Sequence, residues 1–371
     1  MPKAPAQARE AERTAVIAAG GTGGHLFPAQ ALAQALAARG WRIVLASDER
    51  VGGLASNFPA ERRIVLSSAT FRRGDPFGAA AAAFSIARGV FEARGAFASL
   101  SPDVVVGFGG YPSIPAILAA ASEGRRTLIH EQNAVLGRAN RRLAPFASEV
   151  ACGFPKLLKA SAKVRARAVT VGNPVRAEIA ALANGGYEPP GEEIRLLVTG
   201  GSQGARLLSE LVPAAVAKLP EAMRLKLKVM QQTRPESMEA ARRIYADAMV
   251  AAEIAPFFRG MAERLEAAHL VIGRAGASTV SEIAVAGRPS LLVPLKASLD
   301  DDQGQNAAIF AEAGASEAAR EDALTRPIMT AALRKLLSSP RRLSKMAAAA
   351  QSLGRPDAAE RLADLVEQTA R

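Results

Sequence analysis

The sequence contains a single cysteine, Cys152, and no long apolar run. One thiol cannot form an intrachain disulfide, so the cysteine content gives no sign of an oxidising compartment. Residues 1–16 lack the apolar core of a signal peptide, and no later segment reaches the roughly 18 uninterrupted apolar residues of a membrane-spanning helix. We therefore expect a cytoplasmic protein.

Aromatic residues are also scarce, at 5% of the chain, and no Lys/Arg cluster is interleaved with Tyr or Phe. This argues against a nucleic-acid-binding surface. The 47 Lys and Arg nevertheless exceed the 35 Asp and Glu and leave a net charge of +12. Such an excess favours anionic partners, either phosphorylated substrates or an acidic membrane leaflet, although an Arg-rich surface that is merely solvated has the same composition.

Short β-type runs alternate with alanine-rich helical stretches. Strands are expected over residues 14–19, 42–47, 103–108 and 127–130, and helices over 28–40 and 113–124. Buried strands separated by helices are typical of a parallel sheet covered on both faces. The same order restarts at Ile194, and 371 residues with 49% hydrophobic content suffice for two cores.

Two glycine turns mark equivalent points in the two halves. Gly20 and Gly200 each follow a strand and precede a helix, which predicts an α/β protein with two Rossmann-like domains whose parallel sheets face each other across a cleft. The punctuated stretch "VTVGNPVR" places the boundary between an N-terminal domain (1–173) and a C-terminal domain (174–354). A final helix in 355–371, starting at Pro356, is expected to complete the N-terminal domain.

The glycine turns alone leave the ligand open. Backbone N–H groups at such turns bind diphosphates, and the first turn is close to a dinucleotide fingerprint, although Leu26 replaces its third glycine. Asp48 ends the next strand where a ribose would bind, so an NAD(P)-dependent dehydrogenase remains an alternative. Further turns at 107–113 and 273–279 give each domain a pair at the carboxyl ends of its strands, where open α/β sheets bind ligands.

A set of motifs follows in fixed order from about residue 16 to about residue 310: "GGTGGH", "GGYPS", "HEQNAVLGRANR", "GNPVR", "GGSQGA", "GRAGASTVSEIAVAGRPSLLVPL" and "DDQGQNA". Together they resemble the MurG family of glycosyltransferases. The resemblance implies a GT-B fold and inverting transfer of GlcNAc from UDP-GlcNAc to the MurNAc 4-hydroxyl of undecaprenyl-diphospho-MurNAc-pentapeptide (lipid I), which gives lipid II in peptidoglycan synthesis.

The resemblance also implies that the enzyme needs no metal or other cofactor. It implies a peripheral position on the cytoplasmic face of the cell membrane and contact with other cell-wall synthesis proteins. Related GT-B enzymes that act on other lipid acceptors share parts of the second-half motif, so another UDP-sugar transferase remains an alternative. A non-catalytic nucleotide-sugar or nucleic-acid binder explains only the charge.

The family's binding positions carry over onto matching residues of this sequence. Acceptor binding falls on Tyr111 and Asn140, and uracil would meet the backbone of Phe258, although "FRGM" departs from the acidic form expected there. Amide and carboxylate groups at the donor positions suit sugar and ribose hydroxyls. The donor-binding residues that the resemblance implies are Thr22, Gly23, Gly24, Asn133, Arg176, Ser202, Phe258, Ala277, Ser278, Thr279, Val280, Ser281, Glu282 and Gln303.

Three histidines limit the choice of a general base. His25 lies at the mouth of the first glycine loop and is the leading candidate, because an ordinary imidazole exchanges protons near neutrality. The alternative is that His25 only orients the loop. Glu131 is the rival base, His130 is expected to position the adjacent loop, and His269 is expected to be satisfied locally.

The acidic run "LDDDQ" (299–303) is superficially similar to the D-x-D clusters of metal-dependent glycosyltransferases. It directly precedes a helical stretch, and acids at a helix start stabilise the helix dipole. The sequence has no HExxH and no paired Cys/His spacing, so we expect no metal site.

Residues 71–97 are the candidate membrane-docking segment. Phe77, Phe84 and Phe91 recur at heptad spacing, hence near one helical face, and Arg72, Arg73, Arg88 and Arg94 lie nearby. A helix with this pattern docks on anionic lipid. The alternative is that the phenylalanines face the protein core.

Overall fold

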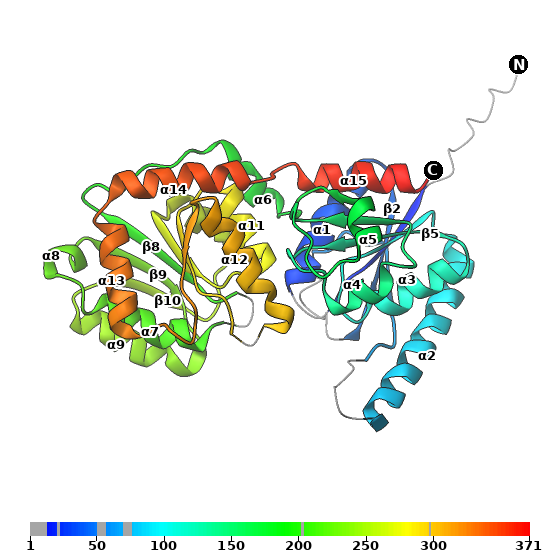
Figure 1. Ribbon diagram of the computed structural model, residues 1–371, viewed down its shortest axis with the longest axis horizontal. Coiled ribbons are helices and arrows are strands. Elements are labelled where there is room, and N and C mark those ends of the chain that lie inside the picture. Colours follow the sequence, from blue (N-terminus) through cyan, green and yellow to red (C-terminus); the bar gives the residue numbers. More distant parts are fainter. Residues whose placement is uncertain (1–12, 21–22, 50–56, 70–75, 202–203, 297) are drawn as a thin grey trace, which may run out of the picture.

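Two parallel sheets form the framework of the structure (Figure 1). The computed structural model describes residues 13–20, 23–49, 57–69, 76–201, 204–296 and 298–371. The N-terminal sheet contains β1 (Thr14–Ala18), β2 (Arg42–Ser47), β3 (Arg62–Val65), β4 (Val104–Gly107), β5 (Arg126–Glu131), β6 (Glu149–Cys152) and β7 (Ala168–Thr170). The C-terminal sheet contains β8 (Ile194–Thr199), β9 (Leu227–Gln232), β10 (Ala251–Ala255), β11 (Leu270–Gly273), β12 (Ser290–Leu292) and β13 (Ser316–Ala318).

In each sheet the chain first adds strands on one side of the initial strand and then adds the later strands on its other side. The N-terminal order is β3-β2-β1-β4-β5-β6-β7, and the C-terminal order is β10-β9-β8-β11-β12-β13. The switch points therefore lie between β1 and β4 and between β8 and β11, where Rossmann-type sheets bind their ligands. The predicted α/β architecture with two Rossmann-like sheets is confirmed.

Helices cover both sheets. Those of the first part of the chain are α1 (Gly23–Ala38), α2 (Pro76–Leu100), α3 (Ser113–Ser122), α4 (Arg138–Leu143) and α5 (Ala162–Arg167). Those of the second part are α6 (Ala177–Ala180), η2 (Ala181–Asn184), α7 (Arg206–Val216), α8 (Glu221–Arg224), η3 (Pro235–Ser237), α9 (Met238–Asp247), α10 (Met261–Ala267), α11 (Ala277–Val285), η4 (Leu299–Asp301), α12 (Asp302–Glu312), α13 (Arg326–Leu337), α14 (Pro340–Leu353) and α15 (Ala358–Thr369).

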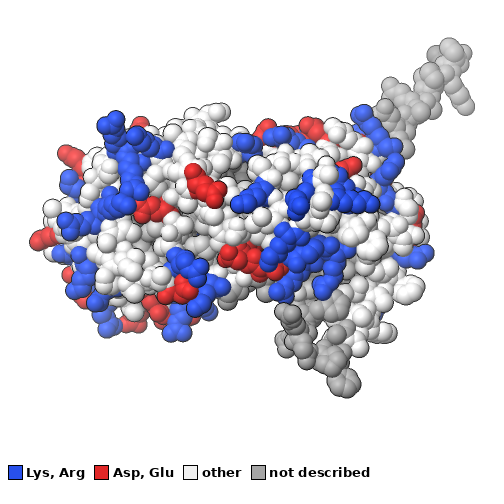
Figure 2. Space-filling view, viewed as in Figure 1, with Lys and Arg blue, Asp and Glu red and all other residues white. Residues whose placement is uncertain are grey.

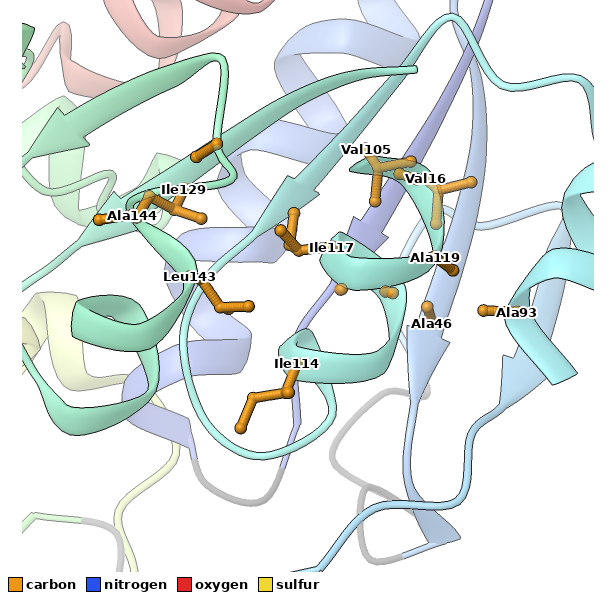
Figure 3. Close-up of a cluster of buried hydrophobic side chains, with 14 of the residues drawn as sticks. Val16, Ala46, Ala93, Val105, Ile114, Ile117, Ala119, Ile129, Leu143 and Ala144 are labelled. Atoms are coloured by element: carbon orange, nitrogen blue, oxygen red, sulfur yellow. The ribbon is translucent and has the colours of Figure 1, made fainter. Parts of the chain in front are cut away.

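Successive side chains of β1 point to opposite faces of the N-terminal sheet, and their neighbours show which helices cover each face. Ile17 points into a cluster with α1 and α15, whereas Val16 points into a cluster with α2, α3 and α4. Ile114 and Ile117 of α3 belong to the second of these clusters, which also contains strand residues such as Val105 (Figure 3). Both faces are therefore buried, which explains why the strands read as continuous apolar runs.

The chain crosses between the two sheets twice, and the crossings touch at Gly172. This glycine has φ +93°, and a Cβ atom there would lie 2.8 Å from Cβ of Arg355 and 3.1 Å from Cβ of Ala358. Only glycine fits this position, because any side chain would be both strained and overlapping. The final helix begins at Ala358 and not, as predicted, at Pro356, which instead lies in the turn that redirects the chain from α14.

Helix α15 packs against α1 on the N-terminal sheet, although it follows the C-terminal sheet in sequence (Figure 1). Leu362 and Val366 are fully buried there. Arg39 adds ion pairs to Glu360 and Asp364 at 2.5 and 2.7 Å, but both carboxylates are more than half exposed. Exposed pairs contribute little, so apolar burial dominates the attachment of α15.

We expect Leu362→Ala to lower the free energy of unfolding of the N-terminal part by about 2–5 kcal/mol, because it removes a fully buried side chain and leaves a cavity. The single tryptophan, Trp41, donates a hydrogen bond to Glu367 of α15, so its fluorescence reports this region during urea unfolding. Arg361→Ala, on the exposed face of the same helix, is the matched control. Equal urea midpoints for the two variants would contradict the conclusion that apolar burial attaches α15.

Candidate active site between the two sheets

The first turns of α1 and α11 meet between the sheets. The Ser278 hydroxyl of α11 donates to the Gly24 carbonyl of α1 over 3.2 Å. Because α1 follows β1 and α11 follows β11, the carboxyl ends of the two sheets face each other at this point. Both helix N-termini bring backbone N–H groups that have no partner within their own helix, together with partial positive charge, to the same place, which suits an anionic ligand.

The N-terminal sheet and the C-terminal sheet, each with its helices, form the two units of the protein. Two buried asparagines join these units beside the first turns of α1 and α11. Asn306 of α12 accepts from the Ala134 N–H and donates to Asn133 Oδ1, each over 3.0 Å. Asn173 donates to the Gln132 carbonyl and to Ser281 Oγ, each over 2.9 Å. The segment that follows β5 is therefore bonded to the C-terminal unit at consecutive residues.

The Glu131 carboxylate organises this segment. It is 2% exposed, and its Oε1 accepts from the backbone and side-chain N–H groups of Asn133 at 3.0 and 3.2 Å. Its Oε2 accepts from the Gly137 N–H and from Asn140 Nδ2, both over 2.9 Å. Four donors fill the acceptor capacity of a carboxylate, so this arrangement holds the loop and leaves no free lone pair toward a substrate.

The two predicted acceptor residues lie in different surroundings. Asn140 is 2% exposed and donates to the His130 carbonyl as well as to Glu131, while its Oδ1 has no hydrogen-bond partner within the described residues. Tyr111 is half-buried and packs against the hydrophobic cluster under α3.

His25 is half-buried at the first turn of α1, with Nδ1 3.3 Å from Gln132 Oε1. The chain at Gly109 and Gly110, both with positive φ, runs beside its ring, and a Cβ atom at either would lie 3.4–3.5 Å from a ring carbon. The left-handed backbone of this turn therefore lets the strand end approach the imidazole closely.

The other two histidines have local hydrogen-bond partners, and His269 Nε2 also lies 3.1 Å from Nη2 of Arg195. His130 is fully buried with Nε2 2.9 Å from the Gly172 carbonyl, and burial lowers the pKa of His130 to about 4. His269 accepts at Nδ1 from the Arg195 N–H over 3.0 Å, as the prediction of local satisfaction requires. Burial and the Arg195 charge lower the pKa of His269. Both stay neutral at pH 7.

Two predicted donor residues contact each other. The Arg176 guanidinium donates to Glu282 Oε1 from Nη2 over 3.1 Å and lies over the ring of Phe27, which belongs to α1. Burial raises the pKa of Glu282, and Arg176 opposes that rise. The ion pair thus stands at the junction of the two units, on the side of α11.

The remaining predicted donor positions are distributed around this junction. Gln303 accepts from the Leu295 N–H over 3.0 Å, and Phe258 is buried beneath the Arg264 guanidinium at 4.4 Å. Thr22 and Ser202 lie outside the described residues. The first turn of α11 comprises Ala277, Ser278, Thr279, Val280 and Ser281, and Gly23 and Gly24 open α1.

Asp300 links the units in a way that the sequence did not predict. Its carboxylate contacts Arg141 and Lys159, both at 2.8 Å, and Arg138 at 3.5 Å. These hydrogen bonds lower the pKa of Asp300 to about 2. In Figure 2, acidic side chains lie against a dense group of basic ones near the middle of the molecule. The acidic run was expected to stabilise a helix start, and Asp302 does begin α12, but Asp300 serves the other unit.

Sequence reasoning missed four residues that the structure places at the junction: Gln132, Asn173, Asn306 and Asp300. A signal existed for Asn306, because it lies on the inward face of α12 with Ala307 and Phe310. For Asp300 the sequence contained no such signal, because its partners Arg141 and Lys159 lie on the other unit and are distant in sequence. In the described part of the chain, no three His, Cys, Asp or Glu side chains gather as a metal site requires. Nor does any helix there have the length and apolarity to cross a bilayer.

The comparisons with known proteins agree with this architecture. The glycosyltransferase family 28 N-terminal domain matches residues 15–152, and the family 28 C-terminal domain matches residues 195–362. A crystal structure of MurG from Acinetobacter baumannii is similar with a TM-score of 0.79 and 31% identity, over 96% of this chain and 99% of that one. The calicheamicin glycosyltransferase CalG4, with a TM-score of 0.66 and 19% identity, covers 97% of this chain and 98% of its own and shares the fold. The fold is that of a GT-B glycosyltransferase.

Curated relatives narrow the family. A UDP-N-acetylglucosamine--N-acetylmuramyl-(pentapeptide) pyrophosphoryl-undecaprenol N-acetylglucosamine transferase from Phenylobacterium zucineum is 67% identical, over 97% of this chain and 99% of its own. A protein with the same name from Caulobacter vibrioides is 62% identical, also over 97% and 99%. The chain belongs to glycosyltransferase family 28 and, within it, to the MurG enzymes.

We expect Asp300→Asn to weaken the attachment of the two units by about 1 kcal/mol at neutral pH, a value discounted because the three cations are partly exposed. The folded-state pKa of about 2 lies below the ordinary 3.8, so the contribution is present above the ordinary value and is lost as pH falls through about 2. Asparagine tolerates the left-handed backbone at φ +65°, so only the charge changes.

The measurement for this variant is the melting temperature at low and high salt. Asp301→Asn is the matched control, because Asp301 also has a left-handed backbone and forms no ion pair within the described residues. The difference between the two variants should shrink at high salt, since screening weakens exposed pairs. Identical melting temperatures at low salt would refute the role of Asp300.

Proposed function

We propose that this protein transfers GlcNAc from UDP-GlcNAc to the MurNAc 4-hydroxyl of undecaprenyl-diphospho-MurNAc-pentapeptide (lipid I), with inversion, to give lipid II for peptidoglycan synthesis. The contact between the first turns of α1 and α11 carries the proposal. It sets His25 on one side of the junction and the Arg176–Glu282 pair on the other. The names of relatives up to 67% identical supply the substrates.

The reaction divides between the two units. The acceptor oxygen attacks the anomeric carbon from the face opposite UDP, its proton passes to His25, and the C1–O bond breaks with its electron pair leaving on UDP. Backbone N–H groups at the α11 turn, with the helix dipole, stabilise the charge that develops on the diphosphate. These groups suffice for charge stabilisation without a protein-bound metal.

The Arg176–Glu282 pair fits the nucleotide side of the reaction. Glu282 can accept hydrogen bonds from ribose hydroxyls, and although burial raises the pKa of this carboxyl, the Arg176 guanidinium opposes that rise. The amides of Gln303 and Asn133 suit the sugar hydroxyls. The backbone near Phe258 would read the uracil edge, while the phenylalanine ring itself is buried.

Between the two candidate bases, the contacts favour His25. All four hydrogen bonds to Glu131 come from its own loop, so taking a substrate proton there would break the contacts that hold residues 131–140. His25 is half-buried, and among the described residues its ring makes one hydrogen bond, to Gln132. We assign proton transfer to His25 and loop positioning to Glu131, with Asn140 and Tyr111 on the acceptor side.

The α2 helix is the proposed docking surface for the cytoplasmic leaflet. Phe84 and Phe91 are 74% and 73% exposed, which favours docking over a core-facing role, and Phe146 nearby is 56% exposed. An apolar groove of about 710 Å³ lies between α2, α3 and α4, lined by residues that include Ile86, Val90, Phe91, Leu118 and Phe146. Arg88 and Arg94 lie on the same helix. Arg72, Arg73 and the Phe77 side chain fall outside the described part.

Membership of family 28 removes the dehydrogenase alternative, which rested on Asp48 and the first glycine loop. It leaves open a GT-B transferase with a different lipid acceptor. Addition of a lipid I analogue distinguishes that alternative, because only the proposed enzyme then releases UDP from UDP-GlcNAc. Contact with other cell-wall synthesis proteins remains part of the proposal.

We expect His25→Ala to lower the rate of UDP release with a lipid I analogue by about 10²- to 10⁴-fold, the usual contribution of a positioned base. UDP and UDP-GlcNAc, but not NAD(P), should still raise its melting temperature, since most of the proposed donor-binding residues lie on the other unit. The control is His269→Gln, which is remote from the junction and should turn over normally. Near-normal turnover by His25→Ala would remove His25 as the base.

We expect the double variant Phe84→Ala/Phe91→Ala to float with anionic liposomes at least tenfold less than the wild type, because each buried phenylalanine contributes about 1.5–3 kcal/mol. Leu225→Ala/Ile328→Ala is the matched control, since both residues are exposed hydrophobics of the C-terminal unit, at 60% and 50%. If the wild type fails to float, or the two double variants float equally, α2 is not the docking surface.

A further inference from the structure

Gln132 lies between two histidines and has no role in the reaction described above. It is 2% exposed, and its side-chain amide contacts the Phe108 carbonyl, His25 and His130. We propose that Gln132 is a positioning residue that holds His25 as the Nδ1–H tautomer and so leaves Nε2 free to take the acceptor proton. The inference rests on the proposed function, in which His25 is the base.

The Phe108 carbonyl fixes the orientation of the amide. Gln132 Nε2 lies 2.9 Å from this oxygen, which only accepts hydrogen bonds. The reversed amide would set Oε1 against the carbonyl, with two acceptors and no proton between them. In a fully buried position that arrangement loses a hydrogen bond and leaves both oxygens unsatisfied. Oε1 therefore faces His25.

The orientation of the amide then determines the tautomer of His25. Gln132 Oε1 also only accepts, and it lies 3.3 Å from His25 Nδ1, so the proton between them must belong to the imidazole. A neutral imidazole has one N–H, and the hydrogen bond at one nitrogen decides which nitrogen carries it. His25 Nε2 is consequently the unprotonated nitrogen.

His130 supports the same assignment from the other side. Its Nε2 lies 2.9 Å from the Gly172 carbonyl, so Nε2 carries the proton and Nδ1 accepts. Nδ1 is 3.4 Å from Gln132 Nε2, which has a second N–H to donate. From Gly172 through His130 and Gln132 to His25, every donor thus meets an acceptor, and the two histidines have opposite tautomers.

The chain of contacts is also anchored mechanically. The Gln132 carbonyl accepts from Asn173, which in turn bonds Ser281 of the C-terminal unit. Gln132 is therefore held through its backbone as well as its side chain. A base in the wrong tautomer lowers the catalytic rate. In a serine-protease triad, the wrong histidine tautomer lowers kcat by about 10⁴-fold.

The test is ¹⁵N NMR of the full-length protein labelled at histidine, recorded at mildly alkaline pH where ordinary imidazoles are neutral. The three histidines give three ring spin systems, assigned with His269→Gln and His25→Ala. His130, whose Nε2–H form follows from the Gly172 carbonyl, should differ from His25, which should be the Nδ1–H tautomer. Both ring nitrogens of His269 face donors of Arg195, so its signals are assigned with the variant and are not used in the comparison. His25 found as Nε2–H in the wild type overturns the inference.

Gln132→Met supplies the second arm, because methionine fills a similar volume without the amide acceptor. His25 should lose its Nδ1–H tautomer, and kcat should fall at least tenfold while KM for UDP-GlcNAc changes less than about twofold. Gln231→Met is the matched control, a fully buried glutamine of the other sheet that likewise accepts from a side chain and donates to carbonyls. An unchanged tautomer and kcat in Gln132→Met would refute the assignment.

The two failures are distinguishable. If the wild type releases no UDP with a lipid I analogue, the proposed function fails, whatever tautomer the spectra show. If the wild type turns over and His25 is Nε2–H, the function stands and the inference about Gln132 falls. Should Gln132→Met not fold, the wild-type spectrum alone still decides the tautomer.

Discussion

The Glu131 carboxylate is the contact on which the rest of the junction depends. Its four hydrogen bonds fix residues 131–140 as one loop, and that loop provides the groups that meet the other unit. A buried carboxylate is tolerated only when its acceptor sites are filled, so the sequence between Asn133 and Asn140 must supply donors at set positions. The buried carboxylate thus determines the conformation of the loop, because its four hydrogen bonds hold residues 131–140 in place.

Two kinds of contact then join the units, and they differ in the range over which they act. The hydrogen bonds of the Asn306 amide act only at contact distance, and each contributes modestly because water competes for the same groups. Asp300 attracts three cations across the same boundary, and an attraction between charges persists over a longer distance. The short-range amides therefore determine how the two units fit together, whereas the charges add an attraction of longer range.

Much of the fold follows from local sequence. Apolar runs such as 42–47 become strands because both faces of a parallel sheet are buried, and β2 spans these same residues. The start of α15 was misplaced at Pro356, because the crossing near Gly172 extends the turn to Asp357, and that contact joins residues far apart in sequence. Local signals therefore predict the elements, whereas the crossings between units displace their ends.

The candidate site was less predictable for the same reason. Motif resemblance located the turns at Gly23 and Ala277, and the structure brings these two turns together. The motifs also contain Gln132 and Asn173, but nothing in the sequence distinguishes a buried amide that bridges elements from one that faces solvent. For Asp300 the partners belong to a different unit, so local sequence contains no information about the pairing.

The first glycine turn differs from a dinucleotide fingerprint at its third glycine, and side chains take the role that backbone has in such a fingerprint. In a dinucleotide fingerprint the third glycine lets the helix close against its strand. Here Leu26 occupies that place and is 1% exposed in the core under α1, so the helix is held by a side chain. The preceding residue, His25, then projects from the same turn toward Gly109, Gly110 and Gln132. A turn of this kind presents an imidazole where a dinucleotide-binding turn presents bare backbone, which accounts for a glycine pattern that is nearly, but not fully, that of a dinucleotide site.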